Sequence, residues 1–235
     1  MGIADFDIPV PGVRLFEKNR ILVLASKKEL FTLDSSVWGG GFNSPCYVVN
    51  QQVDKGYDGD DPREDLIKGI TEIGLNPDAC VGMMTAAHVK DAAVEFEKSG
   101  QLSVTAIATA GTSNAMAAGG TPPAFTFIGA GTINIILLVD GNLTDGAMVN
   151  AVITATEGKT MALNDLKIKD VFTGELASGT STDALVVAVT GKGEKLPYAG
   201  TATEVGGMIG RTVRKSVTEA VRRYLKFKEQ EKNHQ

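Results

Sequence analysis

The sequence predicts an α+β fold, with a mixed β-sheet core layered with helices and two long helices in the C-terminal half. Short strand-like segments crowd the first half of the chain, and the longest helical patterns come after residue 140. Strands and helices do not alternate as they do in repeated βαβ units, which disfavours a purely parallel α/β fold. With 235 residues and 43% hydrophobic content, the chain can bury one core, so we expect a single domain over residues 1–235.

Composition narrows the class of protein. The net charge is −5, and the two cysteines, Cys46 and Cys80, lack C-x-x-C spacing. The acidic balance and the lack of a basic stripe disfavour a nucleic-acid partner. The first ten residues lack the basic and apolar segments of a signal peptide, and no apolar run approaches the ~20 residues of a membrane span. We therefore expect a reduced, cytoplasmic protein without a membrane partner; a single disulfide and a homo-oligomer stay open.

The first half of the chain predicts strands and one helix. Strands are expected over residues 13–16, 20–24, 45–49, 80–87 and 102–110. Asp61 fits as an N-cap, with Pro62 at the first helical position and Glu64 as the capping-box acid. This helix should end near Gly74, because glycine commonly closes a helix.

The second half carries the two long helices. Residues 135–139 form an apolar run bounded by turn residues, which predicts a buried strand that residues 125–128 lead into. Asn142 or Thr144 can cap a helix that continues to about residue 167. A strand over 183–189 precedes a final helix that starts at Thr203 or Glu204. Its apolar stripe consists of Ile209, Val213, Val217, Val221 and Leu225. The charged tail, residues 226–235, is expected to fray.

A Gly-Thr pair followed two residues later by Asn or Thr occurs four times, each time at a predicted element end. The instances are GTSN (111–114), GTIN (131–134), GTST (179–182) and GTAT (200–203). Glycine permits a close backbone path, while the hydroxyl or amide can bond a turn, a helix start or a ligand. Each instance could be a local cap. If the four converge in space, they would form a polar rim able to hold an anion or a carbonyl oxygen.

The central helix carries a polar stripe of its own. Asn150, Thr154 and Glu157 are spaced four and three apart, so they share one helical face. We expect this helix to be mostly buried, which makes Glu157 the better candidate for a general acid or base. A purely structural hydrogen-bond network is the alternative. Lys159 is two residues from Glu157 and points elsewhere, so the two give no evidence for an ion pair.

Scarce histidine limits the chemistry. Only His88 and His234 are present, and a Ser–His–Asp triad would have to use His88, since His234 lies in the charged tail. Two cysteines and one usable histidine lack zinc-ligand spacing, and no G-x-x-x-x-G-K-[ST] loop occurs. We therefore expect no bound metal. Asp183, directly after the GTST turn, could orient a hydroxyl or cap the turn.

Taken in order, ten segments resemble the adenosylcobinamide amidohydrolase family of corrinoid salvage. They are VWGGG (37–41), VNQQV (49–53), VGMMTAA (81–87), GTSNA (111–115), GTINII (131–136), LTDGA (143–147), ATEGKT (155–160), GTSTDA (179–184), AGT (199–201) and EVGGMIGR (204–211). Their order makes the resemblance specific. Two positions depart from the family pattern: Gln51 replaces a histidine that commonly follows Asn50, and Gly158 stands where alanine is frequent. The first weakens any mechanism that needs that histidine.

The resemblance implies hydrolysis of the amide that joins a corrin side chain to aminopropanol, giving adenosylcobyric acid for cobalamin salvage. It implies a corrinoid substrate and no cofactor beyond the substrate's own cobalt. Amide hydrolysis needs a nucleophile or activated water, donors for the oxyanion and an acid for the leaving amine. Glu157 is expected to activate water or protonate the leaving group, while Thr132 and Asn134 stabilise the oxyanion. The candidate catalytic residues are Glu157, Thr132, Asn134 and Asp183. The candidate substrate-binding residues are Gly40, Asn50, Thr85, His88, Asn114, Gly131, Thr180, Thr182 and Glu204.

Two other classes of function stay open. A self-processing amidase or acyltransferase with a Thr or Ser nucleophile would use a Gly-Thr bond and tolerate scarce histidine. A non-catalytic corrinoid-binding module would use glycine-lined surfaces that a flat macrocycle can approach.

Overall fold

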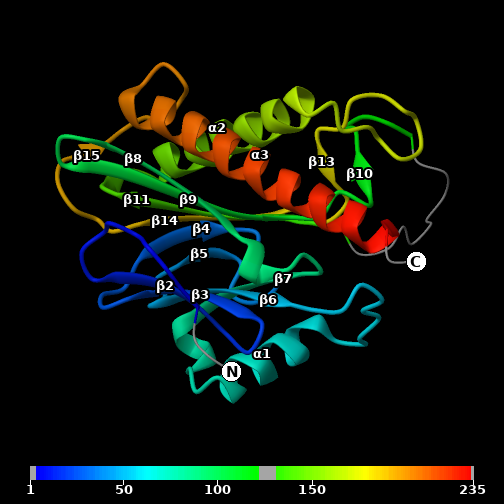
Figure 1. Ribbon diagram of the computed structural model, residues 1–235. Coiled ribbons are helices and arrows are strands. Elements are labelled where there is room, and N and C mark those ends of the chain that lie inside the picture. Colours follow the sequence, from blue (N-terminus) through cyan, green and yellow to red (C-terminus); the bar gives the residue numbers. More distant parts are fainter. Residues whose placement is uncertain (1–3, 122–130, 234–235) are drawn as a thin grey trace.

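Two β-sheets lie face to face between layers of helices (Figure 1). The computed structural model describes residues 4–121 and 131–233. The first sheet has the strand order β1-β2-β3-β6-β7, and the second has the order β5-β4-β14-β11-β9-β8. Neighbouring strands run antiparallel, except that β6 is parallel to β7 and β11 is parallel to β14. Helix α1 covers the outer face of the first sheet, while α2 and α3 cover the outer face of the second.

The elements have the following bounds. The first sheet contains Ala4–Phe6 (β1), Val13–Lys18 (β2), Ile21–Ser26 (β3), Tyr47–Gln52 (β6) and Cys80–Thr85 (β7). The second contains Phe31–Asp34 (β4), Gly41–Asn43 (β5), Ala93–Ser99 (β8), Leu102–Ala110 (β9), Ile133–Asp140 (β11) and Ala184–Val189 (β14). Ala115–Met116 (β10) pairs with Gly179–Thr180 (β13), and Asn142–Leu143 (β12) pairs with Lys195–Leu196 (β15). The helices are Pro62–Glu72 (α1), Asp145–Asp165 (α2) and Glu204–Asn233 (α3), with 3-10 turns at Pro77–Ala79 and Val89–Asp91.

The predicted fold class is confirmed: mixed sheets are layered with helices, and the two long helices come late in the chain. The prediction did not divide the sheet core into two stacked sheets. Strands β4 and β8 were not predicted, because β4 is short and β8 carries acidic and basic residues along an edge of the second sheet. The segment 125–128 lies outside the described residues.

The two faces of β11 supply the layers on either side of the second sheet. Ile135, Leu137 and Val139 pack in the cluster that includes α2 and α3. Ile136 and Leu138, on the other face, pack in the cluster between the two sheets. Successive side chains of a strand point to opposite faces, so the uninterrupted apolar run is what a strand buried on both sides requires.

The ends of α1 and α2 follow local rules. Asp61 caps α1 by accepting from the backbone N–H groups of Arg63 and Glu64 at 2.9 and 3.2 Å. Thr144 caps α2 by accepting from Ala147 N at 3.1 Å. Asn142, the other candidate cap, instead pairs in β12. These caps satisfy N–H groups that the first helical turn leaves unpaired.

Helix α3 continues through the segment that was expected to fray. Its stripe is buried from Ile209 to Val221, whereas Leu225 is exposed. The helix then extends to Asn233, so the prediction of a frayed tail over 226–235 is wrong for residues 226–233. Phe227 packs edge-on against His88, with ring centroids 4.6 Å apart, and Lys55 pairs with Glu231 at 2.9 Å. These contacts with the first sheet's loops hold the last turns in place.

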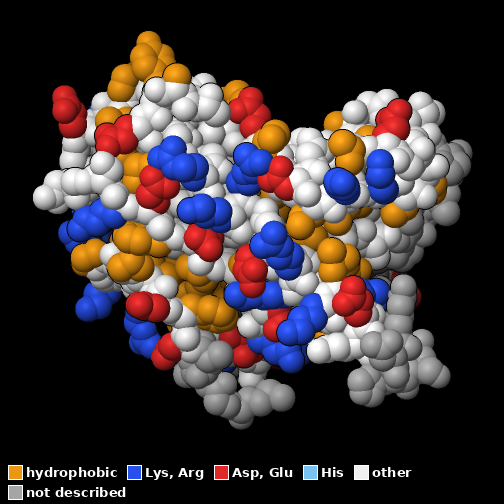
Figure 2. All heavy atoms as spheres, turned by 45° about the horizontal axis from the view of Figure 1, so that its top comes forward, with side chains coloured by type: hydrophobic (Ala, Val, Ile, Leu, Met, Phe, Trp, Pro, Cys, Tyr) orange, Lys and Arg blue, Asp and Glu red, His pale blue; other side chains and the backbone are white. Residues whose placement is uncertain are grey.

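Charged side chains of both signs are interleaved over the α2 and α3 side of the molecule, with hydrophobic side chains between them (Figure 2). The exposed apolar residues of α2 include Val149, Ile153 and Met161. Of the helices in the described ranges, none is long and apolar enough to cross a membrane.

Candidate functional site

Polar side chains gather where β6, β7 and β9 finish and β11 and β14 begin. These strand ends lie on the right of Figure 1. We call this part of the molecule the threonine end; its defining residues are Thr85, Thr109, Thr132, Thr180 and Thr182. Three of the four Gly-Thr segments lie here, together with Asn50, Asn134 and Asp183. Strand pairing brings them together, because β11 is antiparallel to β9 and parallel to β14.

A buried amide pair joins the two sheets at the threonine end. Asn134 Nδ2 donates to Asn50 Oδ1 at 2.9 Å and to Met84 O at 2.8 Å. Asn50 Nδ2 donates to Thr109 Oγ1 at 3.0 Å. An asparagine amide has two N–H donors, and both donors of Asn134 are used within the protein. Asn134 therefore positions its surroundings and has no spare donor for an oxyanion.

The segments GTSN, GTIN and GTST contact one another directly. Asn114 Nδ2 donates to Ser181 Oγ at 2.7 Å. Thr132 Oγ1 donates to the Thr182 carbonyl at 2.7 Å, and Thr182 Oγ1 donates to the Gly131 carbonyl at 3.0 Å. This reciprocal pair of hydroxyl–carbonyl bonds locks the start of β11 to the turn before β14. The expected convergence is thus present for three segments.

The fourth segment, GTAT, lies elsewhere and is a local cap. Thr203 Oγ1 accepts from Gly206 N at 3.0 Å and donates to Gly200 O at 2.8 Å. These bonds close the first turn of α3. The Ala199 carbonyl beside it accepts from Thr154 of α2 at 2.9 Å, so Thr154 has a structural partner.

Asp183 is the centre of a half-buried ionic cluster. Its Oδ1 accepts from Ile133 N at 3.0 Å, and its Oδ2 accepts from Thr180 N at 3.0 Å and pairs with Lys159. The Lys159 and Asp183 side chains are 13% and 14% exposed. The carboxylate therefore caps the GTST turn and also fixes the residue that follows Thr132.

Lys159 is not among the predicted site residues, because it was considered only as a possible ion-pair partner of Glu157. Val152, Thr156 and Lys159 are spaced i, i+4, i+7 on α2, so they share one helical face. With Ile133 and Asp183 they line a cavity of about 160 Å³. That spacing is the sequence signal that could have placed Lys159 toward β11 and β14.

Asn114 carries an acceptor without a donor. Asn114 is buried, and its Oδ1 has no hydrogen-bond partner within residues 4–121 and 131–233. A Cβ atom added to Gly131 would lie 2.4 Å from this oxygen and 2.7 Å from Ser113 Oγ. A side chain at position 131 would displace the Asn114 amide or the Ser113 hydroxyl, and the unsatisfied oxygen is close to the Gly131 α-carbon. A buried acceptor without a donor is unfavourable, so a donor that arrives with a ligand or a chemical change would be stabilised here.

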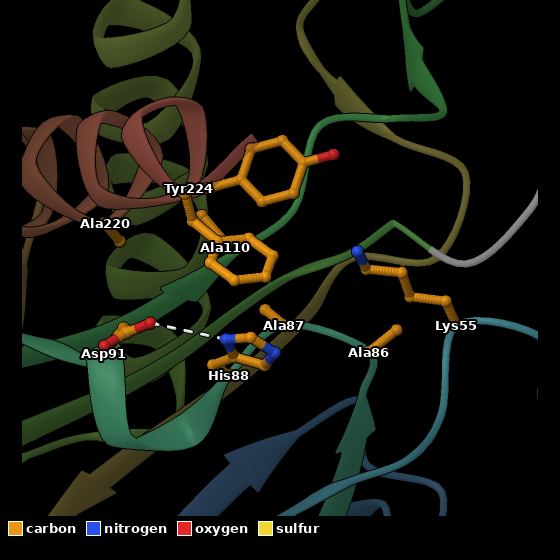
Figure 3. A pocket seen from close by; sticks show the side chains of 9 residues that line it. Lys55, Ala86, Ala87, His88, Asp91, Ala110, Ala220 and Tyr224 are labelled. Atoms are coloured by element: carbon orange, nitrogen blue, oxygen red, sulfur yellow. Dashed lines mark ion pairs between the residues drawn. The ribbon is translucent and has the colours of Figure 1, made fainter. Parts of the chain in front are cut away.

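His88 lies in a separate small pocket on the outer side of this end (Figure 3). Its Nδ1 is 3.5 Å from Asp91 Oδ2. Tyr224 projects from α3 across the pocket, and Lys55 approaches from the loop after β6. The cavity is only about 20 Å³, room for little more than a water molecule. Among the described residues, His88 pairs with Asp91 and packs against Phe227, and neither belongs to the group around Thr132 and Asp183. A triad through His88 therefore has no support in this geometry.

Glu157 does not join the threonine end. It is exposed, contrary to the expectation that its helix would bury it, because it lies on the outward side of α2 toward α3. It lines an open groove of about 640 Å³ together with Gly207, Arg211 and Arg214. Both arginines are engaged, Arg211 with Glu97 and Arg214 with Asp165.

Glu204 is also separate from the residues around Thr132. Glu204 accepts from Ser99 at 2.5 Å, beyond the β9–β11 pair of Ser103 and Asp140. Strand β11 runs seven residues onward from Ile133 to Asp140, so the Asp140 end of the strand is about 23 Å from its start. Gly40 belongs to the β4–β5 connection, where an added Cβ would lie 2.9 Å from Ser36 O.

Thr85 is close to Asn50 in the first sheet. Its hydroxyl accepts a hydrogen bond from Ala87 N at 3.0 Å, so it stabilises the turn that follows β7.

The model of the adenosylcobinamide amidohydrolase family matches residues 9–229. The chain belongs to this family. A Methanosarcina mazei protein named adenosylcobinamide amidohydrolase is 31% identical over an alignment of 205 residues, which covers 83% of this chain and 88% of that protein. A Halobacterium salinarum protein of the same name is 30% identical over an alignment of 193 residues, which covers 78% of this chain and 77% of that protein. An uncharacterized protein of Methanocaldococcus jannaschii is 32% identical over an alignment of 237 residues, which covers 91% of this chain and 90% of that protein.

For a member of this amidohydrolase family, Cys80 is a poor nucleophile candidate. Cys80 starts β7, at the end of that strand opposite Thr85, and burial raises the pKa of its thiol to about 12. Since the thiolate is the reactive form, Cys80 stays protonated near neutral pH. In the described parts of the chain, no three His, Cys, Asp or Glu side chains gather as metal ligands would.

Proposed function

We propose that the protein hydrolyses the amide between the corrin side chain and aminopropanol of adenosylcobinamide, releasing adenosylcobyric acid. Family membership supports the reaction class, and the convergence of three Gly-Thr segments on Thr132 supports the place. In a cytoplasmic setting, the product would return imported cobinamide to cobalamin synthesis. The cobalt belongs to the substrate, so we expect turnover to persist after treatment with a chelator.

The amide arm of the substrate, not its ring, has to reach the threonine end. The cavity beside Ile133, Lys159 and Asp183 is about 160 Å³, which is far too small for a corrin macrocycle. A slender amide side chain fits a space of this size. We therefore place the ring outside, with the scissile amide extended toward the start of β11.

Thr132 is the group that we propose to attack the amide carbonyl. It is buried, and its hydroxyl is fixed by the Thr182 carbonyl at 2.7 Å. The Thr182 hydroxyl, which donates to the Gly131 carbonyl at 3.0 Å, would turn from that carbonyl to a developing oxyanion. Asp183 positions the attacking residue through Ile133 N, and Lys159 holds Asp183.

The test is incubation of the purified protein with adenosylcobinamide and mass analysis for adenosylcobyric acid. Asp183→Asn should lower kcat, because it breaks the pair that fixes the start of β11. A matched control exists at the other end of the same strand, where Asp140 pairs with Lys192 at 2.8 Å. Asp140→Asn should leave turnover near wild type. Equal losses in both variants, or no product from the wild type, would contradict the proposal.

Two alternatives have their own outcomes. Retention of cobinamide without product would favour a non-catalytic corrinoid-binding module. Water activation by Glu157 stays a prediction and is tested by Glu157→Gln, which should be inactive if Glu157 has that role. Because Glu157 is exposed in the α2–α3 groove, we expect the Glu157→Gln variant to keep full turnover.

A further inference from the structure

The Gly131–Thr132 peptide bond already has the contacts of an acyl-transfer site. The Thr182 hydroxyl donates to the Gly131 carbonyl at 3.0 Å, so a donor is in place for an oxyanion on that carbon. The Thr132 hydroxyl is held at 2.7 Å from the Thr182 carbonyl, and the chain itself keeps it next to the Gly131 carbonyl carbon. Such an attack is intramolecular, so the burial of Thr132 does not hinder it.

The site lacks a general base for a threonine nucleophile. A threonine hydroxyl is weak without an adjacent base, which limits repeated turnover of a substrate more than a self-cleavage that each chain undergoes once. The charged side chains that contact the start of β11 in the described part of the chain, Lys159 and Asp183, pair with each other. His88 is in the separate pocket with Asp91. An N-terminal threonine supplies its own base, because an α-amino group has a pKa of about 7.7–8.0.

The unpaired oxygen of Asn114 supplies a second, independent observation. It is buried, has no partner in the described residues, and lies 2.4 Å from where a Cβ at Gly131 would be. A primary amine at Thr132 carries more N–H donors than a peptide nitrogen does. Cutting the chain here would therefore free an amine on the residue that follows Gly131, and the unsatisfied Asn114 oxygen lies close to the position of a Gly131 Cβ.

We infer that the chain cuts itself between Gly131 and Thr132 and that the freed Thr132 is the nucleophile. Thr132 Oγ1 bonds to the Gly131 carbonyl carbon as the carbon–nitrogen bond breaks, and the hydroxyl proton ends on the Thr132 nitrogen. Water then hydrolyses the resulting ester to a Gly131 carboxylate and a free hydroxyl, so the net change is the addition of one water. The substrate's acyl group would later take the place of Gly131, with Thr182 again as the donor.

The cleavage is tested by intact-mass measurement and N-terminal sequencing of the full-length protein. We expect two fragments, the second beginning Thr132-Ile133-Asn134. The bonds Gly111–Thr112, Gly179–Thr180 and Gly200–Thr201 are internal controls and should stay intact. A catalytically active preparation that consists only of the uncut chain would overturn the inference, and so would cleavage at one of the three control bonds.

Three variants separate the chemistry from a loss of folding. Thr132→Ala should abolish cleavage, whereas Thr132→Ser should retain it. Thr182→Val keeps the backbone carbonyl that holds Thr132 but removes the hydroxyl donor, so it should slow cleavage about 10²–10³-fold. Thr182→Ser should restore the rate. Circular dichroism confirms that each variant is folded, and cleavage of a folded Thr132→Ala chain at this bond would contradict the mechanism.

The role of freed Thr132 in turnover rests on the proposed function, whereas the cleavage does not. Cleavage without hydrolysis of adenosylcobinamide would overturn the proposed function and leave the self-cleavage standing. Hydrolysis of adenosylcobinamide by an uncut chain would overturn the self-cleavage and leave the proposed function standing. Both results come from one preparation when mass analysis of the protein accompanies the assay.

Discussion

Asn134 is a residue whose contacts predict a stability effect larger than its size suggests. Removing its amide takes one donor from the buried Asn50 Oδ1 and one from the partly buried Met84 O, and each such loss costs about 1–3 kcal/mol when the acceptor is buried. We expect Asn134→Leu to lower the free energy of unfolding by about 2–4 kcal/mol, measured by urea denaturation. The double variant Asn50→Leu/Asn134→Leu should lose less than the sum of the single changes; strict additivity would show that the two amides do not interact.

The Asp170 carboxyl group should make the free energy of unfolding depend on pH. Its oxygens accept from Ala117 N at 2.6 Å, Phe172 N at 2.7 Å and Thr173 N at 2.9 Å. These backbone bonds, with that of Ala117 the strongest, lower the pKa of Asp170 below its usual range. The unfolded state then binds the proton more readily, so the stabilisation is complete above about pH 4 and is lost as pH falls through the folded pKa.

The comparison variant is Asp170→Asn, which cannot titrate. The difference in unfolding free energy between wild type and Asp170→Asn should be largest near pH 6 and should shrink toward pH 3. Because Asp170 ties the segment after α2 to the segment that carries Asn114, amide exchange around residues 113–117 should rise in parallel. A difference that is constant over this pH range would show that the Asp170 charge plays no part.

At the scale of elements, the crossing of α2 and α3 depends on Gly158. A Cβ at this position would lie 3.0 Å from the Gly210 carbonyl and 3.5 Å from Val213. Alanine gains about 1 kcal/mol of helix propensity over glycine, which the tight contact offsets, so Gly158→Ala should be near neutral. Gly158→Leu should destabilise by about 1–3 kcal/mol through overpacking. Thermal denaturation of the two variants provides the measurement, and equal melting temperatures would count against this account.

The last turns of α3 are held by packing more than by charge. Phe227 contacts His88, whereas Glu231 pairs with Lys55 at the surface. Exposed ion pairs contribute about 0–1 kcal/mol, while a half-buried aromatic ring contributes more through its contact area. Phe227→Ala should therefore lower the melting temperature clearly more than Glu231→Gln. A larger effect of Glu231→Gln would reverse this order of importance.

At the scale of the whole molecule, local patterns predicted more than long-range contacts did. Strand β9, the caps Asp61 and Thr144, and the start of α3 follow from short-range rules. The pairing of Asn134 with Asn50 joins residues 84 positions apart, and no single-sequence pattern reports that distance. Glu157 and Lys159 show a weaker form of this limit: the spacing places them on different faces of α2, and packing selects the face of Val152 and Lys159 to meet the strands.

Substrate binding should slow hydrogen exchange at one end of the stacked sheets and not at the other. The threonine end holds Thr132 and the cavity beside Asp183, whereas the far end holds Glu204 and a groove of about 600 Å³. If the corrinoid amide enters at the threonine end, hydrogen exchange should slow there and stay unchanged at the far end. Adenosylcobinamide mixed with the folded but inactive Thr132→Ala variant should protect amides near residues 111–116, 131–134 and 179–183. Protection centred on residues 99–103 and 192–196 would place the corrinoid at the wrong end for hydrolysis by Thr132.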